Sequence, residues 1–339
     1  MSEELMIKTP ITEMFNIQYP IICGAMMWLG VPQLCEVVAD AGGMGTVTAA
    51  IYKTEQEFRA AIVDTKRRLD GRSFMVGVTI LPSATLDQEH YKMYLRVCAE
   101  EKVPGVEVSG QPIDRACSRN EIDMLKNAGV KLFQKLGSLR HALHCEKVGY
   151  DGIYAAGFEE GGHPLNDDVT TMVLTPRIAE EVSIPVVTVG GIADGRTMAA
   201  ALTLGASGVM MATRFLATTD CCEIHDNHRA EFVKRQEYET EMIAKNLGLQ
   251  CRALSNGIVK EINVVEAANG GLDQMMPLMT GQRVRESWVN GDVNYGVETL
   301  GQSVGLIKDI PTTAELLERM AKEALASVDK TRALFQGGR

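Results

Sequence analysis

Residues 185–215 read PVVTVGGIADGRTMAAALTLGASGVMMATRF, and this stretch decides the fold. A short apolar run, Val186–Val189, ends at Gly190 and Gly191, and an Ala- and Leu-rich stretch leads to a second apolar run over 209–211. Two parallel strands that stop side by side at small residues can direct backbone N–H groups at one phosphate. Strands 7 and 8 of a (β/α)8 barrel do this at their C-terminal ends. The stretch therefore predicts a phosphorylated ligand or cofactor, with ordinary turn glycines as the plainer alternative.

The composition is that of a globular protein. The 339 residues are 45% apolar and 23% charged, which allows one large barrel with additions or two ordinary domains. A net charge of −10 argues against nucleic acid or an anionic membrane as the main partner. The N-terminal stretch MSEELMIKTP lacks the apolar segment of a signal peptide, and no apolar run is long enough to cross a bilayer. A cytoplasmic protein is expected.

The cysteines give no sign of a metal site. There are eight of them, scattered and without a C-x-x-C pair. Zinc and iron–sulfur sites need clustered ligands, so no metal is predicted. We expect these side chains to be reduced and mostly buried, as cysteines are in cytosolic proteins.

Short apolar runs alternate with amphipathic stretches along the first two thirds of the chain. Buried parallel strands are predicted over 19–23, 45–48, 74–80, 105–108, 131–134, 152–155, 186–189 and 208–211. Helices are predicted over 31–41, 55–69, 115–128, 139–148 and 196–204, several of them followed by a glycine. Eight strands at about 24 residues per unit is the density of a (β/α)8 TIM barrel. A doubly wound open sheet is the alternative.

The pattern changes after residue 215. Residues 222–248 are expected to form one long polar helix, a mixed segment follows over 251–292, and a last helix is expected over 313–334. We therefore predict an α/β protein of two parts. Residues 1–216 and 301–339 form the TIM barrel, and residues 217–300 form a small, mainly helical cap domain over its mouth.

The predicted strand ends are rich in small residues and poor in carboxylates, with one lysine, one histidine and no metal-ligand cluster. They include Gly24, Ala25, Met26, Gly77, Gln111, Lys135, Gly161, Gly162, Gly190, Gly191, Ala212 and Thr213. Such a lining suits a planar cofactor that packs against small residues and is anchored through a phosphate. FMN fits this description, and it would supply the chemistry itself.

The stretch GFEEGGHPLNDD, over 157–168, is the second strong signal. Gly161 and Gly162 allow the backbone to approach a flat ligand closely. His163 follows at once, and an imidazole there can donate a hydrogen bond or exchange a proton near neutral pH. His163 is thus the predicted catalytic residue. The plainer interpretation is a histidine that only ties its loop to neighbouring carbonyls.

Other side chains near these strand ends have weaker signals. Lys135 can offset negative charge on a reduced flavin, and Met26 and Met27 can form a hydrophobic wall of the pocket. Glu159 and Glu160 are expected on a solvated surface, with Glu160 the better candidate to support the neighbouring histidine.

Seven blocks together resemble one known family. They are YPIICGAMMWLG, AGGMGTVTAA, VGVTILP, KVGYDGIYAAGFEEGGHP, IPVVTVGGIADGR, ATRFLAT and NGDVNYGVETLGQSVGLIKDI. The chain looks like the nitronate monooxygenase superfamily of FMN-dependent (β/α)8 enzymes over nearly its whole length. That superfamily also holds flavin-dependent enoyl-ACP reductases and FMN-dependent NADH:quinone reductases. The GFExxGHPxxDD form, with VTILP and RFLAT, is most similar to the quinone reductase branch.

The resemblance implies particular residue roles. It implies FMN contacts at Gly24, Met26, Lys135, Gly190, Gly191, Ala212 and Thr213. It implies that His163 faces the substrate and that Pro82 lies in a loop covering the active site. Three positions depart from the family pattern: Gly77 replaces an Asn, Ala212 replaces a Gly, and Gln111 stands where the quinone reductase branch has Asn. A homodimer is a further expectation from the resemblance.

The leading expectation is an FMN oxidoreductase that passes hydride from NADH or NADPH to a quinone-like acceptor. No G-x-G-x-x-G fingerprint follows a predicted strand, so the nicotinamide would bind transiently over the flavin, under the cap. The alternatives are a nitronate monooxygenase, which consumes O2, and a reductase of enoyl thioesters. A redox-silent barrel, such as a phosphosugar isomerase or lyase, is the alternative from another class. The lack of a strand-end carboxylate pair argues against the isomerase.

Overall fold

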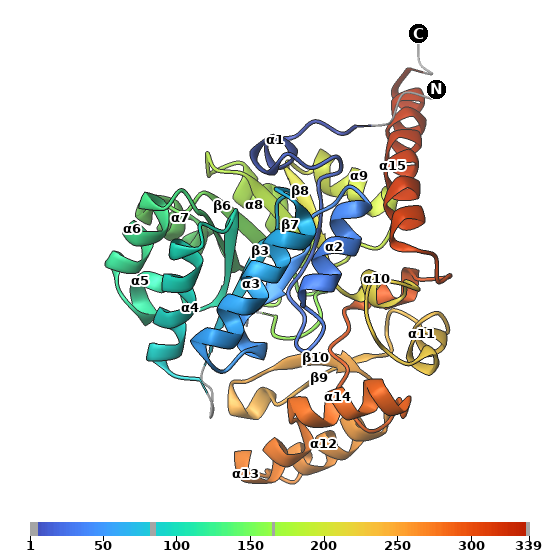
Figure 1. The fold of residues 1–339 in the computed structure, drawn as a ribbon. Helices are drawn as coiled ribbons and strands as arrows, with labels where there is room; N and C mark the ends of the chain where they lie inside the picture. The colour runs from blue at the N-terminus through green and yellow to red at the C-terminus, as the bar shows by residue number, and fades with distance from the viewer. Residues whose placement is uncertain (1–5, 82–85, 165–166, 337–339) are drawn as a thin grey trace.

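The chain folds into an eight-stranded parallel barrel surrounded by helices (Figure 1). The structure is a computed structural model and describes residues 6–81, 86–164 and 167–336. The strands are β1 (Ile21–Cys23), β2 (Thr46–Thr48), β3 (Met75–Ile80), β4 (Gly105–Gly110), β5 (Lys131–Leu136), β6 (Gly152–Ala156), β7 (Val186–Val189) and β8 (Gly208–Met211). β1 pairs with β8, and an isolated parallel bridge between Ile22 and Met44 joins β1 to the β2 side. The predicted TIM barrel is confirmed, and the open doubly wound sheet is excluded.

Helices cover the outside of the barrel. They are α2 (Pro32–Asp40), α3 (Glu55–Leu69), α4 (Gln88–Glu100), α5 (Ile113–Ala116), α6 (Arg119–Asn127), α7 (Leu139–Val148), α8 (Thr171–Ala179) and α9 (Gly195–Thr203). The single helix predicted over 115–128 is wrong, because the chain breaks at Cys117, whose φ and ψ are −121° and −101°. Ser118 then begins α6 by accepting a hydrogen bond from the N–H of Asn120.

The N-terminal end of the barrel is filled with apolar side chains. Helix α1 (Pro10–Phe15) places Ile11 and Phe15 in one buried cluster with Phe133 and Tyr154 from inside the barrel. The rings of Phe15 and Phe133 lie 5.8 Å apart. Because this end is packed, a ligand can reach the barrel interior only from the mouth, which is the end where the strands have their C-termini.

The single polar helix predicted over 222–248 is wrong. Helix α11 (Asp226–Phe232) ends early, and β9 (Thr240–Ile243) pairs antiparallel with β10 (Cys251–Leu254). A turn separates α11 from β9: the N–H of Glu239 donates to the carbonyl of Gln236 at 3.1 Å, and the N–H of Gln236 donates to the Glu239 carboxylate at 2.7 Å. The pairing of β9 with the buried strand β10 outweighs the local preference of this segment for helix.

The segment 217–300 contains this hairpin, but most of its regular structure is helical. It also contains α12 (Gly257–Ala267), α13 (Leu272–Met275) and α14 (Gly281–Asn290), which gather with β9 and β10 at one end of the molecule in Figure 1. The indole N–H of Trp28, in the loop after β1, donates to the carbonyl of Gly281 at 2.9 Å, so α14 begins against a loop of the mouth. The exact boundaries of this cap remain a prediction.

The chain returns to the barrel after the cap. Helix α15 (Thr313–Gln336) packs along α9, and its far end extends beyond the barrel (Figure 1). In the described ranges, no helix combines the length and the apolar character that crossing a membrane would require.

Candidate active site

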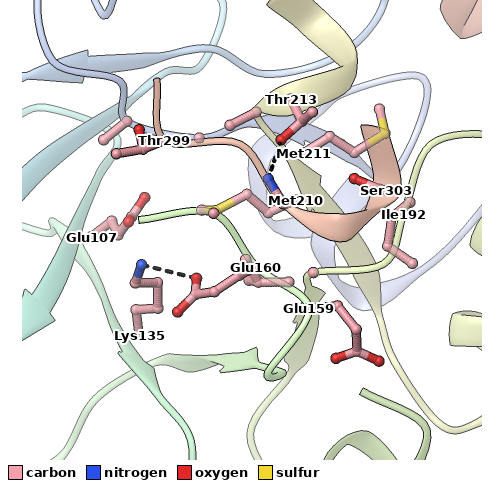
Figure 2. A pocket seen from close by; sticks show the side chains of 17 residues that line it. Glu107, Lys135, Glu159, Glu160, Ile192, Met210, Met211, Thr213, Thr299 and Ser303 are labelled. Atoms are coloured by element: carbon pink, nitrogen blue, oxygen red, sulfur yellow. Dashed lines mark hydrogen bonds and ion pairs between the residues drawn. The ribbon is translucent and has the colours of Figure 1, made fainter. Parts of the chain in front are cut away.

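A cavity opens at the mouth of the barrel and encloses about 570 Å³, part of it open to solvent. Its wall comes from the ends of several strands, from the loop after β6 and from residues 299–303 of the returning chain. In Figure 2, Glu107 and Lys135 lie toward one end of this cavity, while Thr213, Ser303 and Ile192 lie toward the other. The two ends differ in chemistry.

One end presents backbone N–H groups. Gly190 and Gly191 follow β7 with φ angles of 94° and 75°, and Ala212 and Thr213 follow β8. Among the described residues, the N–H groups of Gly191, Ala212 and Thr213 have no hydrogen-bond acceptor. Backbone N–H groups without a protein acceptor can bind an anion. This end therefore suits a phosphate, as the sequence predicts.

The other end carries charged side chains. Lys135, on β5, donates from Nζ to Oε2 of Glu160 at 3.0 Å, and Glu160 is buried (Figure 2). Glu107, on β4, is only 3% exposed. In the part of the chain that the structure describes, Oε2 of Glu107 and Oε1 of Glu160 have no hydrogen-bond partner. Two buried carboxyl groups thus lie under the influence of one ammonium group, which is paired with Glu160.

Burial and mutual charge set the protonation of this group. Burial raises the pKa of Glu107 to about 7; the positive charge of Lys135 opposes this shift and Glu160 adds to it. Burial alone would lower the pKa of Lys135, but the carboxylates of Glu160 and Glu107 outweigh it and raise that pKa. Lys135 therefore stays charged, while Glu107 holds a proton over part of the neutral range.

The expectation of a lining poor in carboxylates is wrong. Glu107, Glu159 and Glu160 all line the cavity. Glu159 does not simply face solvent either, because its carboxylate accepts hydrogen bonds from the N–H and the hydroxyl of Thr171 at the start of α8. The argument against an isomerase that rested on missing carboxylates therefore fails. A glutamate inside the apolar run GVEVSG was the sequence signal that could have revealed Glu107.

The predicted catalytic His163 lies at the mouth and not among the residues of the cavity wall. Its neighbour Gly162 forms a two-bond bridge with Arg252 of β10: Gly162 N donates to Arg252 O at 3.0 Å, and Arg252 N donates to Gly162 O at 2.6 Å. The His163 side chain reaches solvent, yet the surrounding protein lowers its pKa, and the charge of Lys135 lowers it further. Its imidazole is therefore neutral at pH 7.

The structure brings some predicted residues together and leaves others apart. The cavity wall contains Gly24, Ala25, Lys135, Gly161, Gly190, Ala212 and Thr213. Outside it lie Met26, Met27, Gly77, Gln111, Gly162, Gly191 and His163. Pro82 is outside the described residues. The cofactor, substrate and catalytic roles of all these residues remain predictions.

Two of the residues outside the wall have a clear structural environment. Met27 is 41% exposed, whereas Met26 is buried. A Cβ added at Gly77 would lie 2.6 Å from the Cβ of Ala25. The departure from the family Asn at this position thus fits a close approach between β3 and the loop after β1.

Part of the wall was not predicted at all. Thr299, Gly301 and Ser303 line the cavity, and the N–H of Gly301 donates to the Thr213 hydroxyl at 3.0 Å. These residues lie within the block NGDVNYGVETLGQSVGLIKDI, far along the chain from the barrel strands, and the resemblance of that block gave them no role at the cavity. Only the path of the chain back from the cap reveals them.

The two ends of the cavity fit FMN. Unpaired backbone N–H groups suit its phosphate, and buried polar groups with no protein partner suit the polar edge of its ring. Within the described residues, no group of three or more His, Cys, Asp or Glu side chains is placed to bind a metal ion.

Known proteins resemble this chain over most of its length. FabK from Thermotoga maritima is 31% identical, with a TM-score of 0.85, over 97% of this chain and 100% of that chain. A Rhodococcus jostii (strain RHA1) relative, the (3aS,4S,5R,7aS)-5-hydroxy-7a-methyl-1-oxo-octahydro-1H-indene-4-carboxyl-CoA dehydrogenase, is 29% identical over 97% of this chain and 99% of its own length. A probable nitronate monooxygenase from Staphylococcus aureus (strain Newman) is 30% identical over 76% of this chain and 81% of its own.

The family model described as nitronate monooxygenase matches residues 8–323, from before α1 into α15. This match covers the barrel, the cavity wall and the cap together. The chain therefore belongs to the nitronate monooxygenase family and is a flavin-dependent oxidoreductase.

Proposed function

We propose that this enzyme passes hydride from NADH or NADPH, through FMN, to a quinone-like acceptor. The observation that carries the proposal is the two-ended cavity: Ala212 and Thr213, whose backbone N–H groups have no acceptor among the described residues, line one end, and Lys135 with its ion-pair partner Glu160 lines the other. Bound FMN would supply the two-electron chemistry. A cytoplasmic location and a homodimer remain predictions from the sequence.

The chain's own residues have distinct tasks in this proposal. The loops after β7 and β8 hold the phosphate through backbone N–H groups. Lys135 supplies positive charge beside the ring, where negative charge develops on reduction. His163 stands over the mouth with a neutral imidazole and can give a hydrogen bond to an acceptor carbonyl or exchange a proton with it.

The visible spectrum under argon tests the proposal directly. We expect the purified protein to show a flavin spectrum, to bleach on addition of NADH or NADPH, and to recover when benzoquinone is added. A flavin that bleaches only with an alkyl nitronate would identify a nitronate monooxygenase instead. If the protein binds no flavin, even after addition of FMN, a sugar phosphate becomes the expected ligand of the phosphate end of the cavity.

A second candidate acceptor is an enoyl thioester. The relative named for a CoA substrate covers 97% of this chain, cap included, whereas the nitronate monooxygenase relative covers 76%. Quinones and enoyl thioesters are both conjugated carbonyl compounds, so one site can serve either. Reoxidation of the reduced enzyme by crotonyl-CoA, at a rate above that with benzoquinone, would select the thioester.

Replacing His163 with Ala is expected to slow reduction of the acceptor by roughly 100-fold, the usual contribution of a general acid–base group. Bound flavin and its reduction by NADH should change little, because His163 lies outside the cavity wall. Since the pKa of this imidazole is lowered, His163 is neutral at pH 7, and acceptor reduction by the wild type should rise as the pH drops through that pKa, because imidazolium is the stronger hydrogen-bond and proton donor. Rapid-mixing kinetics of the two half-reactions would check this, and an equal acceptor rate in the variant would exclude His163 from the mechanism.

A further inference from the structure

Glu107 is the buried group of the cavity whose chemistry the proposed function does not use. We propose that Glu107 contacts the cofactor, keeping its proton and donating it in a hydrogen bond to an acceptor atom of the flavin ring. This inference rests on the assignment of FMN to the cavity.

The side chain of Glu107 is placed for such a contact. In the barrel register it lies opposite Gly77 on β3 and Phe133 on β5, and it lines the cavity (Figure 2). It is 3% exposed, and its Oε2 has no partner among the described residues. A buried polar oxygen without a partner is costly, so a ligand atom in the cavity is the natural partner. A protonated carboxyl group can donate to that atom, whereas a carboxylate can only accept.

The neighbours of Glu107 favour its protonated form. Lys135 is engaged with Glu160, and in the described chain it makes no ion pair with Glu107. Two carboxyl groups close to one ammonium group cannot both be neutralised by it, which favours a proton on one of them. Tyr154, on β6, also faces Glu107, and Cys251, on β10, faces the lysine and its partner. Neither side chain brings a positive charge.

The chemistry of FMN agrees with a donor at this place. Its ring presents carbonyl oxygens and ring nitrogens that accept hydrogen bonds. Ionised Glu107 would instead bring a negative charge into a cavity that holds an anionic cofactor. The protonated form therefore binds FMN more tightly, and bound FMN must in turn raise the pKa of Glu107 above the value near 7 that burial sets.

The holoenzyme provides the test. The dissociation constant of FMN would be measured from pH 5.5 to 9 by the fluorescence of released flavin, for the wild type and for Glu107→Gln. For the ratio of the wild-type constant to that of Glu107→Gln, we expect a constant value below pH 7 and a rise of up to about tenfold per pH unit above it. A glutamine amide donates without titrating, so the variant should show no such rise. The phosphate of FMN titrates near pH 6 and affects both proteins alike, so the ratio of the two constants isolates Glu107.

Two further variants sharpen the result. Glu159→Gln removes a carboxylate from the same cavity wall, one already engaged with Thr171, and should keep the rise above pH 7. Glu107→Leu removes the donor and should bind FMN more weakly than Glu107→Gln at every pH. A ratio of the two constants that stays flat from pH 5.5 to 9 would overturn the proposal. A wild-type protein without bound flavin would overturn the FMN assignment itself, and this inference with it.

Discussion

Replacing Lys135 with Met is expected to lower turnover by at least about 100-fold, the cost of removing one charge that stabilises a developing negative charge. It should also lower the free energy of unfolding by roughly 3 kcal/mol, because a buried carboxylate loses its partner. Glu160 is 5% exposed, and its second oxygen already lacks a hydrogen bond among the described residues. With the ammonium gone, Glu107 loses the positive charge that acts on it, and Glu160 keeps only the influence of Arg252.

The pH dependence of this loss has a defined sign. Without Lys135 the pKa of Glu160 must rise further above its usual range, since burial then acts unopposed by that charge. A folded-state pKa above the unfolded value means that stability is lost as the pH rises through it. Lys135→Met should therefore unfold at nearly the wild-type temperature at pH 5 and well below it at pH 8. Thermal unfolding at both pH values, with saturating FMN, measures this.

Matched variants distinguish the effect of losing the Lys135 charge from the effect of changing the packing around its side chain. Lys135→Arg keeps a cation and should retain most of the stability. The double variant Lys135→Met with Glu160→Gln removes both charges, and should recover stability without recovering turnover. Wild-type stability and turnover in Lys135→Met alone would mean that the ion pair has no such role.

Replacing Gly190 with Ala is expected to weaken FMN binding by about 100-fold, through roughly 1–3 kcal/mol of backbone strain added to a steric clash. Gly190 has a φ of 94°, and a Cβ there would lie 2.9 Å from the backbone nitrogen of Glu160. Relief of that contact must move either the loop after β7 or the loop that carries Glu160. In either case the backbone N–H groups that we propose to hold the phosphate lose their arrangement.

Riboflavin, which lacks the phosphate, makes this test specific. The wild type should bind FMN far more tightly than riboflavin, and Gly190→Ala should reduce that preference. Gly129→Ala is the matched control, because Gly129 has a φ of 82° but no atom within 4 Å of an added Cβ. It should cost stability and leave flavin binding unchanged. An unchanged preference for FMN in Gly190→Ala would place the phosphate elsewhere.

The barrel could be predicted from the sequence because its strands are buried on both faces. Such strands appear as short, nearly continuous apolar runs, and the runs at 186–189 and 208–211 coincide with β7 and β8. The cap could not be predicted in the same way. Residues 240–254 form a hairpin whose second strand, β10, bonds to Gly162, and that contact comes from a distant part of the chain. Local composition there is compatible with a polar helix as well.

The residues that line the cavity could be predicted where they directly follow a strand. They could not be predicted where their position depends on how the strands pair and how the chain returns to the barrel. Gly190 and Thr213 line the cavity as predicted, because small residues directly after neighbouring parallel strands meet at the barrel mouth, while their role in holding a phosphate stays a prediction. Glu107 was overlooked because a single acid within an apolar strand gives no clue to its orientation until the register with β3 and β5 is known. Gly301 could be placed in the cavity wall only once the path of the chain back from the cap was known.

The hydrogen bond between Gly301 and Thr213 joins the two points at which the chain leaves and rejoins the barrel. The segment between these two residues, which includes the cap, thus begins and ends in the wall of one cavity, and this hydrogen bond joins its two ends. Its outer elements, α12 and α13, can vary in length or be exchanged without displacing the groups that hold the cofactor. With such an arrangement, changes in the cap can alter the substrate that is oxidised or reduced, while the barrel residues that line the cavity stay the same.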